Sequence, residues 1–196
     1  MTKTKIEWAD EVWNPVTGCT KVSEGCRHCY AETMAKRFWT KDHIELEYVS
    51  GVADNDIVRE VFVPRDFTEV RCHPERLDQP LHWRKPRKVF VNSMSDLFHD
   101  DVPDEFISAV WMRMIATPQH NYQILTKRPS RMLKIVNNLF KGLFDRMPHV
   151  ASNVWLGVSV EDQKTADERI PLLLQTSAVV RFVSCEPLLG SINLDN

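Results

Sequence analysis

The chain has 196 residues, of which 43% are hydrophobic and 27% charged, a balance that excludes a disordered or fibrous protein and supports one sizeable core. A formal net charge of −2 and an isoelectric point near 6.4 exclude a general electrostatic attraction to nucleic acid or anionic lipid. No stretch approaches the roughly 20 consecutive apolar residues that span a bilayer, and five cysteines do not suit a disulfide framework, so we expect a single cytoplasmic domain over residues 1–196 with no membrane partner.

Short β-prone runs alternate with helix-like stretches along the chain. The candidate strands cover residues 11–18, 67–73, 88–93, 121–127, 153–160 and 178–185. The helix-like stretches cover residues 30–39, 74–83, 103–116, 129–140 and 162–175, and Pro171 should break or kink the last of them. Strand then helix, repeated, predicts an α/β fold whose parallel sheet is either covered on both faces or curled into a barrel. The polar, mixed segment near 40–66 breaks this rhythm and is predicted to be an insertion over one rim.

Polar and thiol side chains follow each candidate strand. In parallel α/β folds the loops after the carboxyl ends of the strands build the site, so we expect these residues to converge on one face: Cys19, Cys26, Cys29, His73, Glu75, Asn92, Ser93, Ser95, Asp96, Thr126, Lys127, Arg128, Ser159, Glu161, Asp162, Ser184, Cys185 and Glu186. Ser95 and Asp162 are more typical of turns and helix caps. Cys72 and Cys185 are expected to be buried as small apolar residues.

Three cysteines lie close together in the loop after the first candidate strand. Cys19, Cys26 and Cys29 have the spacing C-x6-C-x2-C, which lets one loop fold around one centre. Thiolate is a soft ligand that suits zinc or iron–sulfur clusters. A structural zinc site needs a fourth ligand, which His28, His43 or Cys72 could supply, whereas three cysteines suffice for an iron–sulfur cube with one open iron. The spacing leaves both alternatives open.

This loop, after the first strand of a repeating strand–helix chain, resembles the radical S-adenosylmethionine superfamily. The spacing departs from the usual C-x3-C-x2-C by three extra residues between the first two cysteines. The resemblance implies a partial (β/α)6 TIM-like barrel in which Cys19, Cys26 and Cys29 bind a 4Fe-4S cluster. Its open iron would chelate S-adenosylmethionine, and one electron from an electron donor protein would cleave this cosubstrate to methionine and a 5′-deoxyadenosyl radical.

The same resemblance suggests roles for the residues that end the later strands. Asn92, Ser93, Asp96 and Ser159 are candidates for holding the ribose and amino acid ends of S-adenosylmethionine. Lys127 or Arg128 would face its carboxylate. Glu161 and Glu186 are candidate catalytic residues that orient the substrate or move protons.

A second resemblance covers most of the chain outside the insertion. The stretches "WNPVTGCTKVSEGCRHCYAE", "ILTKRP", "NVWLGVSVEDQ" and "VRFVSCEPLLG" are similar to a three-cysteine-motif family of unknown function encoded by phages and bacteria. Longer relatives continue past the last of these stretches, and we expect this chain to lack their C-terminal strands. A phage setting favours a nucleotide or nucleic-acid substrate. The alternative function is a zinc-binding module that interacts with nucleic acid or protein.

Overall fold

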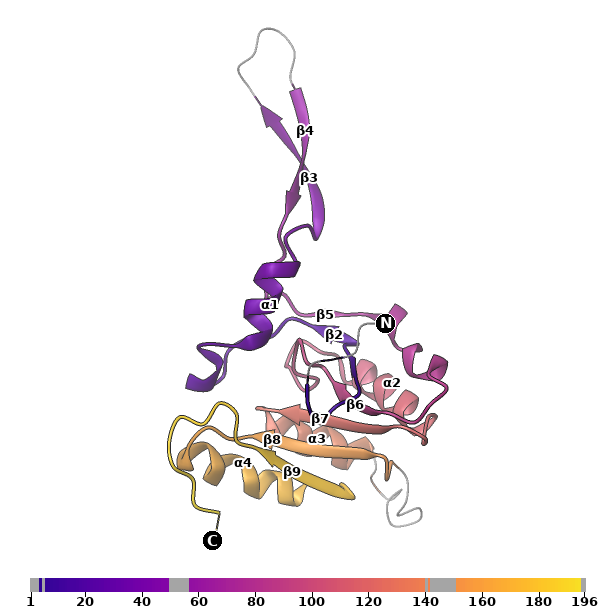
Figure 1. The fold of residues 1–196 in the computed structure, drawn as a ribbon, viewed down its shortest axis with the longest axis vertical. Helices are drawn as coiled ribbons and strands as arrows, with labels where there is room; N and C mark the ends of the chain where they lie inside the picture. Colours follow the sequence, from indigo (N-terminus) through magenta and orange to yellow (C-terminus); the bar gives the residue numbers. More distant parts are fainter. Residues whose placement is uncertain (1–3, 5, 50–56, 140, 142–150, 195–196) are drawn as a thin grey trace.

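A sheet of parallel strands forms the centre of the computed structural model (Figure 1). The structure describes residues 4, 6–49, 57–139, 141 and 151–194, and within these ranges the central sheet has five strands in the order β1-β6-β7-β8-β9. Each neighbouring pair is parallel, so all five carboxyl ends lie on one edge. The predicted α/β class is confirmed by these strands: β1 Glu11–Trp13, β6 Lys88–Val91, β7 Asn121–Thr126, β8 Val154–Ser159 and β9 Val180–Ser184.

Three helices return the chain between the strands. Helix α2 (Asp104–Ile115) connects β6 to β7, α3 (Pro129–Leu139) connects β7 to β8, and α4 (Gln163–Gln175) connects β8 to β9. Helices α3 and α4 pack against each other, and α4 also packs against β8 and β9. The predicted helices are confirmed here, with residue 140 outside the described residues. Helix α4 continues through Pro171 instead of ending there.

The core lies between the sheet and these helices. The strands are buried because apolar and mainly β-branched side chains fill them, as is typical of parallel strands covered on their faces. Full burial of each such aliphatic side chain contributes about 1.5–3 kcal/mol. The cluster includes the strand residues Val89, Val91, Ile124, Leu156 and Val158 and the helix residues Ile107, Val110, Met114, Met132 and Val136.

The structure corrects the predicted strand over residues 67–73. Only Arg71–Cys72 forms a strand, β5, and it pairs antiparallel with β2 (Val16–Thr17) outside the central sheet. The partial barrel therefore has five parallel strands in the described residues, not six. The run is mixed polar and apolar, and no residue after Phe67 in it is fully buried, whereas central parallel strands are typically near-continuous apolar runs.

The predicted helix 74–83 is replaced by two 3-10 helices, η2 (Pro74–Arg76) and η3 (Gln79–His82). A continuous α-helix is disfavoured there because Pro80 has no N–H to donate to a carbonyl four residues earlier. A third 3-10 helix, η1 (Glu24–Cys26), precedes helix α1 (Tyr30–Phe38). None of the described helices combines the length and the hydropathy that crossing a bilayer requires.

The predicted insertion near 40–66 forms an antiparallel hairpin. Strands β3 (His43–Val49) and β4 (Ile57–Val63) pair along their whole length, and residues 50–56 of the insertion lie outside the described residues. Figure 1 shows the hairpin projecting from the body beyond α1. The insertion is therefore an element of its own, and it does not extend the central sheet.

Candidate functional site

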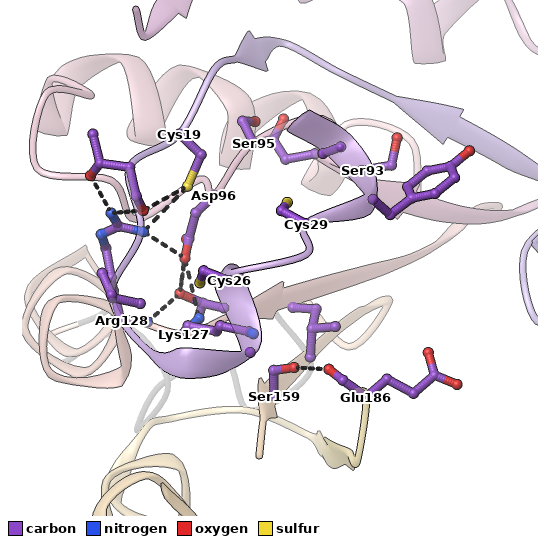
Figure 2. Close-up of a pocket in the computed structure, with 18 of the residues that line it drawn as sticks. Cys19, Cys26, Cys29, Ser93, Ser95, Asp96, Lys127, Arg128, Ser159 and Glu186 are labelled. Carbon is purple, nitrogen blue, oxygen red and sulfur yellow. Dashed lines mark hydrogen bonds and ion pairs between the residues drawn. The ribbon is translucent and has the colours of Figure 1, made fainter. Parts of the chain in front are cut away.

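A cavity of about 430 Å³ opens at the carboxyl edge of the sheet (Figure 2). Its walls come from the three-cysteine loop, the start of α1, and the segments that end β6, β7, β8 and β9. Among the predicted site residues, the structure gathers these around the cavity: Cys19, Cys26, Cys29, Asn92, Ser93, Ser95, Asp96, Thr126, Lys127, Arg128, Ser159 and Glu186. Glu161 is not in this lining and lies beneath the cysteine loop.

His73 and Glu75 do not join this group. They follow β5, which lies outside the central sheet, and the His73 ring contacts the hydroxyl of Thr17 at 2.7 Å and the carboxylate of Glu75 at 3.0 Å. The expectation that all strand-end residues converge is therefore wrong for these two. The cause is the misassigned strand, because only the strands of one parallel sheet direct their carboxyl ends to a common edge.

The three cysteines lie in or next to three short elements that follow one another along the chain, and all three line the cavity. Cys19 follows β2, Cys26 ends η1, and Cys29 is the N-cap of α1. All three are free thiols of intermediate exposure. Figure 2 shows their sulfurs bordering the same space from different sides. Across the described residues, no three histidine, cysteine, aspartate or glutamate side chains already stand at metal-binding distance from one another.

The chemistry of this donor set fits a thiolate-bound metal centre. Three thiols from one short loop line a single cavity, and soft sulfur ligands favour iron–sulfur clusters or zinc over hard cations. Among the candidates for a fourth zinc ligand, His28 also lines the cavity. Cys72 lies in β5 and packs against the core, and His43 begins β3. The donors therefore fit a three-thiolate cluster, with His28 as the described residue that suits zinc.

Cys19 and Cys26 have different proton affinities. Burial and the nearby Asp96 carboxylate raise the pKa of the Cys19 thiol to about 11, although Arg128 opposes the shift. The pKa of Cys26 is lowered, because hydrogen bonds at Val22 and Ser23 and the charge of Lys127 outweigh the effect of burial. Cys26 is therefore the more readily ionised thiol of the two.

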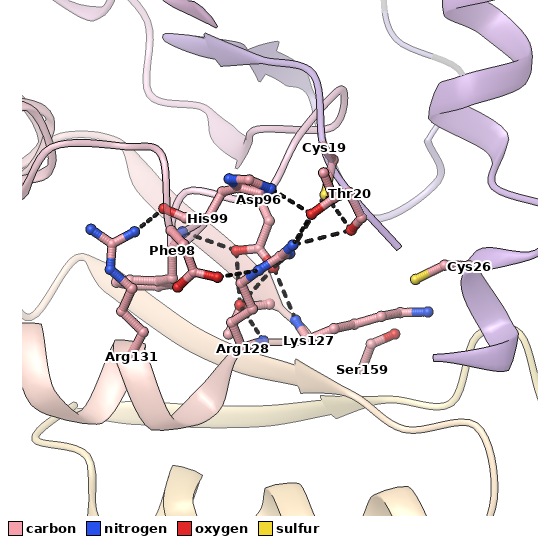
Figure 3. A network of polar contacts seen from close by, with 12 residues as sticks. Cys19, Thr20, Cys26, Asp96, Phe98, His99, Lys127, Arg128, Arg131 and Ser159 are labelled. Atoms are coloured by element: carbon pink, nitrogen blue, oxygen red, sulfur yellow. Dashed lines mark hydrogen bonds and ion pairs between the residues drawn. The ribbon is translucent and has the colours of Figure 1, made fainter. Parts of the chain in front are cut away.

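Arg128 holds the start of the cysteine loop against the sheet (Figure 3). Its Nη1 lies 3.5 Å from the Cys19 sulfur and 3.3 Å from Asp96 Oδ2. Its Nη2 donates to the carbonyl and hydroxyl oxygens of Thr20 at 3.1 and 2.9 Å. The Arg128 side chain is 8% exposed, so this buried cation is neutralised and bound mainly by groups of the protein itself.

Asp96 is the anionic partner of this network. Both of its carboxylate oxygens accept from the Thr126 hydroxyl at 2.8 Å, and Oδ2 also accepts from the backbone N–H of Lys127 at 3.2 Å. On the other side, Thr20 Oγ1 contacts the buried His99 ring at 2.7 Å. The ends of β6 and β7 are thereby joined to the residue that follows Cys19.

Glu161 is buried, with only 1% of its surface exposed. Its Oε1 contacts Lys127 Nζ at 2.5 Å and Arg169 Nη1 at 3.4 Å. Burial alone would raise its pKa, but hydrogen bonds from Lys127, Ser23 and Gly25 lower it to about 2. Glu161 is thus a permanent carboxylate near neutral pH, and Lys127 is paired with it.

Asn92 has the features of a strained residue in a binding site. It follows β6 and has a positive φ of 62°, which is uncommon outside glycine and costs free energy. It is 3% exposed, and its Oδ1 accepts from the Val16 N–H at 3.3 Å. Its amide Nδ2 is buried without a hydrogen-bond partner among the described residues, and the residue lines the cavity.

Three further predicted residues, Ser93, Ser159 and Glu186, line the cavity. Ser93 Oγ donates to Asn14 Oδ1 at 3.3 Å, and Ser159 Oγ donates to the Glu186 carbonyl at 2.9 Å. Glu186 is exposed. Cys185 is exposed as well, which corrects the expectation of a buried thiol. It follows β9, the edge strand of the sheet, where no further described strand covers it.

Several supporting residues were missed from the sequence. Ser23, Gly25 and Arg169 surround Glu161, and Thr20 links Cys19 to the Arg128 network. Thr20, Ser23 and Gly25 lie within the three-cysteine stretch, and the unusual length of the spacer could have pointed to them. Arg169 lies in α4, and no feature of the sequence pointed to it. Asp162 forms the helix cap that its residue type suggested, since its side chain accepts from the Thr165 N–H.

Comparisons with known proteins found one similar fold and one matching family. The fold is similar to that of spore photoproduct lyase, solved as a cysteine-to-serine mutant, with a TM-score of 0.52 and 11% sequence identity. The match covers 93% of this chain and 46% of the lyase, so the chain spans less than half the length of that protein, and at this identity the likeness concerns the fold alone. No curated protein matches the sequence. The family model for proteins of unknown function described as DUF5131 matches residues 3–196, and the chain belongs to this family.

Proposed function

We propose that this chain is a radical S-adenosylmethionine-type iron–sulfur enzyme in which Cys19, Cys26 and Cys29 hold a 4Fe-4S cluster. The observation that carries the proposal is that three free thiols of one loop border a single cavity at the carboxyl edge of a parallel sheet. The likeness in fold to a spore photoproduct lyase, itself a radical S-adenosylmethionine enzyme, supports it. Three ligating thiolates leave one iron open for a cosubstrate.

When bound, such a cluster supplies one electron to the sulfonium of S-adenosylmethionine. The contribution of this chain is to bind and orient the cosubstrate and to exclude water from it. The unpartnered amide of Asn92 is a donor held ready for an acceptor atom. The hydroxyls of Ser93 and Ser159 lie in the same lining and suit the ribose or the amino acid end.

Asp96, Lys127 and Arg128 also line the cavity, but their charged groups already contact protein partners. We propose that they act on the cosubstrate through the shape and electrostatic potential of the cavity wall more than through direct ion pairs. Glu186 differs because its exposed carboxylate lies at the cavity mouth. It is our candidate for orienting a substrate or accepting a proton from it.

The substrate is proposed only as a class. The resemblance to a family of phages and bacteria favours a nucleotide or nucleic acid, and an electron donor protein is needed to reduce the cluster. The zinc-binding interaction module is the second candidate, and the position of His28 in the cavity lining favours it.

Anaerobic purification with iron and sulfide reconstitution tests the proposal. We expect a brown protein with a stoichiometric cluster, an electron paramagnetic resonance signal after dithionite reduction that changes on adding S-adenosylmethionine, and 5′-deoxyadenosine as product. Cys26→Ala should abolish colour and product. Cys185→Ala is the matched control, because this thiol is exposed and outside the cavity lining. A colourless protein that retains one tightly bound zinc after anaerobic handling would falsify the cluster and establish the second candidate.

A further inference from the structure

The spacer between the first two cysteines lies against a buried carboxylate. It comprises Thr20–Gly25, six residues. Ser23 Oγ donates to Glu161 Oε1 at 2.7 Å, and the Gly25 N–H donates to Glu161 Oε2 at 3.1 Å. The second half of the spacer therefore satisfies both oxygens of one side chain that belongs to the loop after β8, far away in the sequence.

Glu161 is fixed from its other side by the sheet and α4. Lys127 at the end of β7 and Arg169 in α4 contact Oε1, and the Glu161 N–H donates to Thr165 Oγ1 at 2.8 Å. A fully buried carboxylate is costly unless charged and hydrogen-bonding partners compensate it. The spacer supplies two of these partners, so the docking of the loop and the burial of Glu161 depend on each other.

Contact between the spacer and Glu161 is direct because position 25 is glycine. A Cβ atom there would lie 2.4 Å from Glu161 Cδ and 2.6 Å from Oε1. Any side chain at this position would force the loop and the carboxylate apart. Gly25 is buried and immediately precedes Cys26, so the closest approach falls next to the second cysteine.

The contact is transmitted to the Cys26 thiol through one turn of 3-10 helix. The Cys26 N–H donates to the Ser23 carbonyl at 3.0 Å, and Ser23 Oγ lies 3.8 Å from Cys26 Sγ. The hydroxyl of Ser23 thus stands between Glu161 and the thiol. When Glu161 holds Ser23 and Gly25 in place, it also fixes the direction in which Cys26 faces the cavity.

We infer that Glu161 is a positioning residue that anchors the Thr20–Gly25 spacer and thereby sets the place of Cys26. It contacts neither the cavity nor a reacting atom, so a catalytic role is not part of this inference. The anchor explains how a spacer three residues longer than in the superfamily that the chain resembles still brings its second cysteine to the cavity. The importance of this placement for a cluster depends on the proposed function, whereas the anchoring itself exists in the metal-free protein.

The test compares the alkylation rates of Cys26 and Cys29 in the metal-free protein by peptide mass spectrometry. In Glu161→Gln and in Gly25→Ala we expect Cys26 to react several-fold faster relative to Cys29 than in the wild type. One variant removes the charge and the other keeps it, so a shared effect reports position instead of thiol ionisation. Glu168→Gln, an exposed carboxylate of α4, is the matched control and should leave the ratio unchanged.

A double variant tests whether the contact is direct. Glu161→Asp shortens the carboxylate and makes room for the new Cβ, so Glu161→Asp with Gly25→Ala should restore the rate ratio toward the wild type relative to Gly25→Ala alone. After reconstitution, the single variants should lose about 10- to 100-fold in iron affinity. If Glu161→Gln does not fold, Gly25→Ala and its rescue by Glu161→Asp make the same comparison, because both keep the carboxylate and the Ser23 hydroxyl.

Failure of the anchoring by Glu161 and failure of the proposed function would give different results. Wild-type rate ratios in both Glu161→Gln and Gly25→Ala would show that the spacer is not anchored by Glu161, whatever metal the protein holds. A wild-type protein that takes up no iron, with the altered ratios still present in the variants, would refute the proposed function and leave the anchor standing.

Discussion

Arg128 carries a buried positive charge beside a thiol that we assign to the cluster. Arg128 or Lys127 was expected to face a cosubstrate carboxylate, but the Arg128 guanidinium contacts Asp96, Thr20 and the Cys19 sulfur. A guanidinium suits this position because its planar donors can satisfy several acceptors in fixed directions, which a lysine ammonium cannot reproduce. Lys127 is paired with Glu161 in the same way.

Replacing this arginine should change the electronic properties of a bound cluster. Arg128→Gln removes a cation and a hydrogen-bond donor from the Cys19 sulfur, so the added electron is less stabilised and the midpoint potential should become more negative. Iron affinity should fall about 10- to 100-fold, as for other residues that orient metal ligands. A redox titration followed by electron paramagnetic resonance measures the shift. Arg113→Gln, at a surface ion pair with Asp78, is the control, and equal potentials in the two variants would contradict the assignment.

Among the elements, β8 packs closely against the neighbouring strand β9 at a glycine. Gly157 is paired with Leu125 of β7 on one side and Phe182 of β9 on the other. A Cβ at position 157 would lie 2.5 Å from the ring of Phe182, so the ring occupies the space that the glycine leaves. The edge strand β9 is therefore held by a ring laid over the backbone of its neighbour.

We expect Gly157→Ala to destabilise the protein by about 1 kcal/mol, at the lower end for overpacking, because the half-buried Phe182 ring can move aside. Urea unfolding followed by circular dichroism measures this loss. Gly190→Ala is the control, since its nearest atom, the Asp162 Cβ, lies at 3.5 Å, and it should be close to neutral. Equal stability of the two variants would show that the ring does not fill this position.

At the scale of the whole molecule, the chain consists of a parallel α/β body and a projecting hairpin (Figure 1). Strands β3 and β4 pair with each other and not with another described strand. The two arms of the insertion are held together at its base, where the Asp42 N–H donates to the Val63 carbonyl at 3.1 Å and the Arg65 N–H donates to the Trp39 carbonyl at 3.1 Å. The cavity lining contains no residue of β3 or β4.

Excising residues 43–63 and joining Asp42 to Pro64 through two glycines should leave the body folded. Loops that close at a paired base tolerate such changes at small entropic cost. We expect the melting temperature to shift by no more than a few degrees and the iron content after reconstitution to match the full chain. Loss of the cluster on excision would mean that the hairpin contributes to the site.

Parts of the candidate site were predictable because they depend on local order along the chain. The strands over 88–93, 121–127 and 153–160 are short β-prone runs, and the residues at their carboxyl ends reach the cavity since parallel strands share a carboxyl edge. The run 67–73 was misassigned because a short segment of mixed polar and apolar residues fits either a sheet strand or a short side ribbon. Glu161 was predicted to be a catalytic residue, but it is buried outside the cavity lining, and its burial depends on Lys127 and Arg169, which lie in other elements.

The sequence by itself determined the α/β class, the parallel strands and the three-cysteine loop, because hydrophobic periodicity and residue spacing act over short stretches. Only the tertiary structure decided which strands share one sheet, which cations are already paired, and that the long spacer rests on a buried carboxylate. These are contacts between residues far apart in the sequence, separated by 32 positions for Arg128 with Asp96 and by 138 for Ser23 with Glu161. Their partners are selected by packing and by the need to satisfy buried charge, and neither of these is encoded in local spacing.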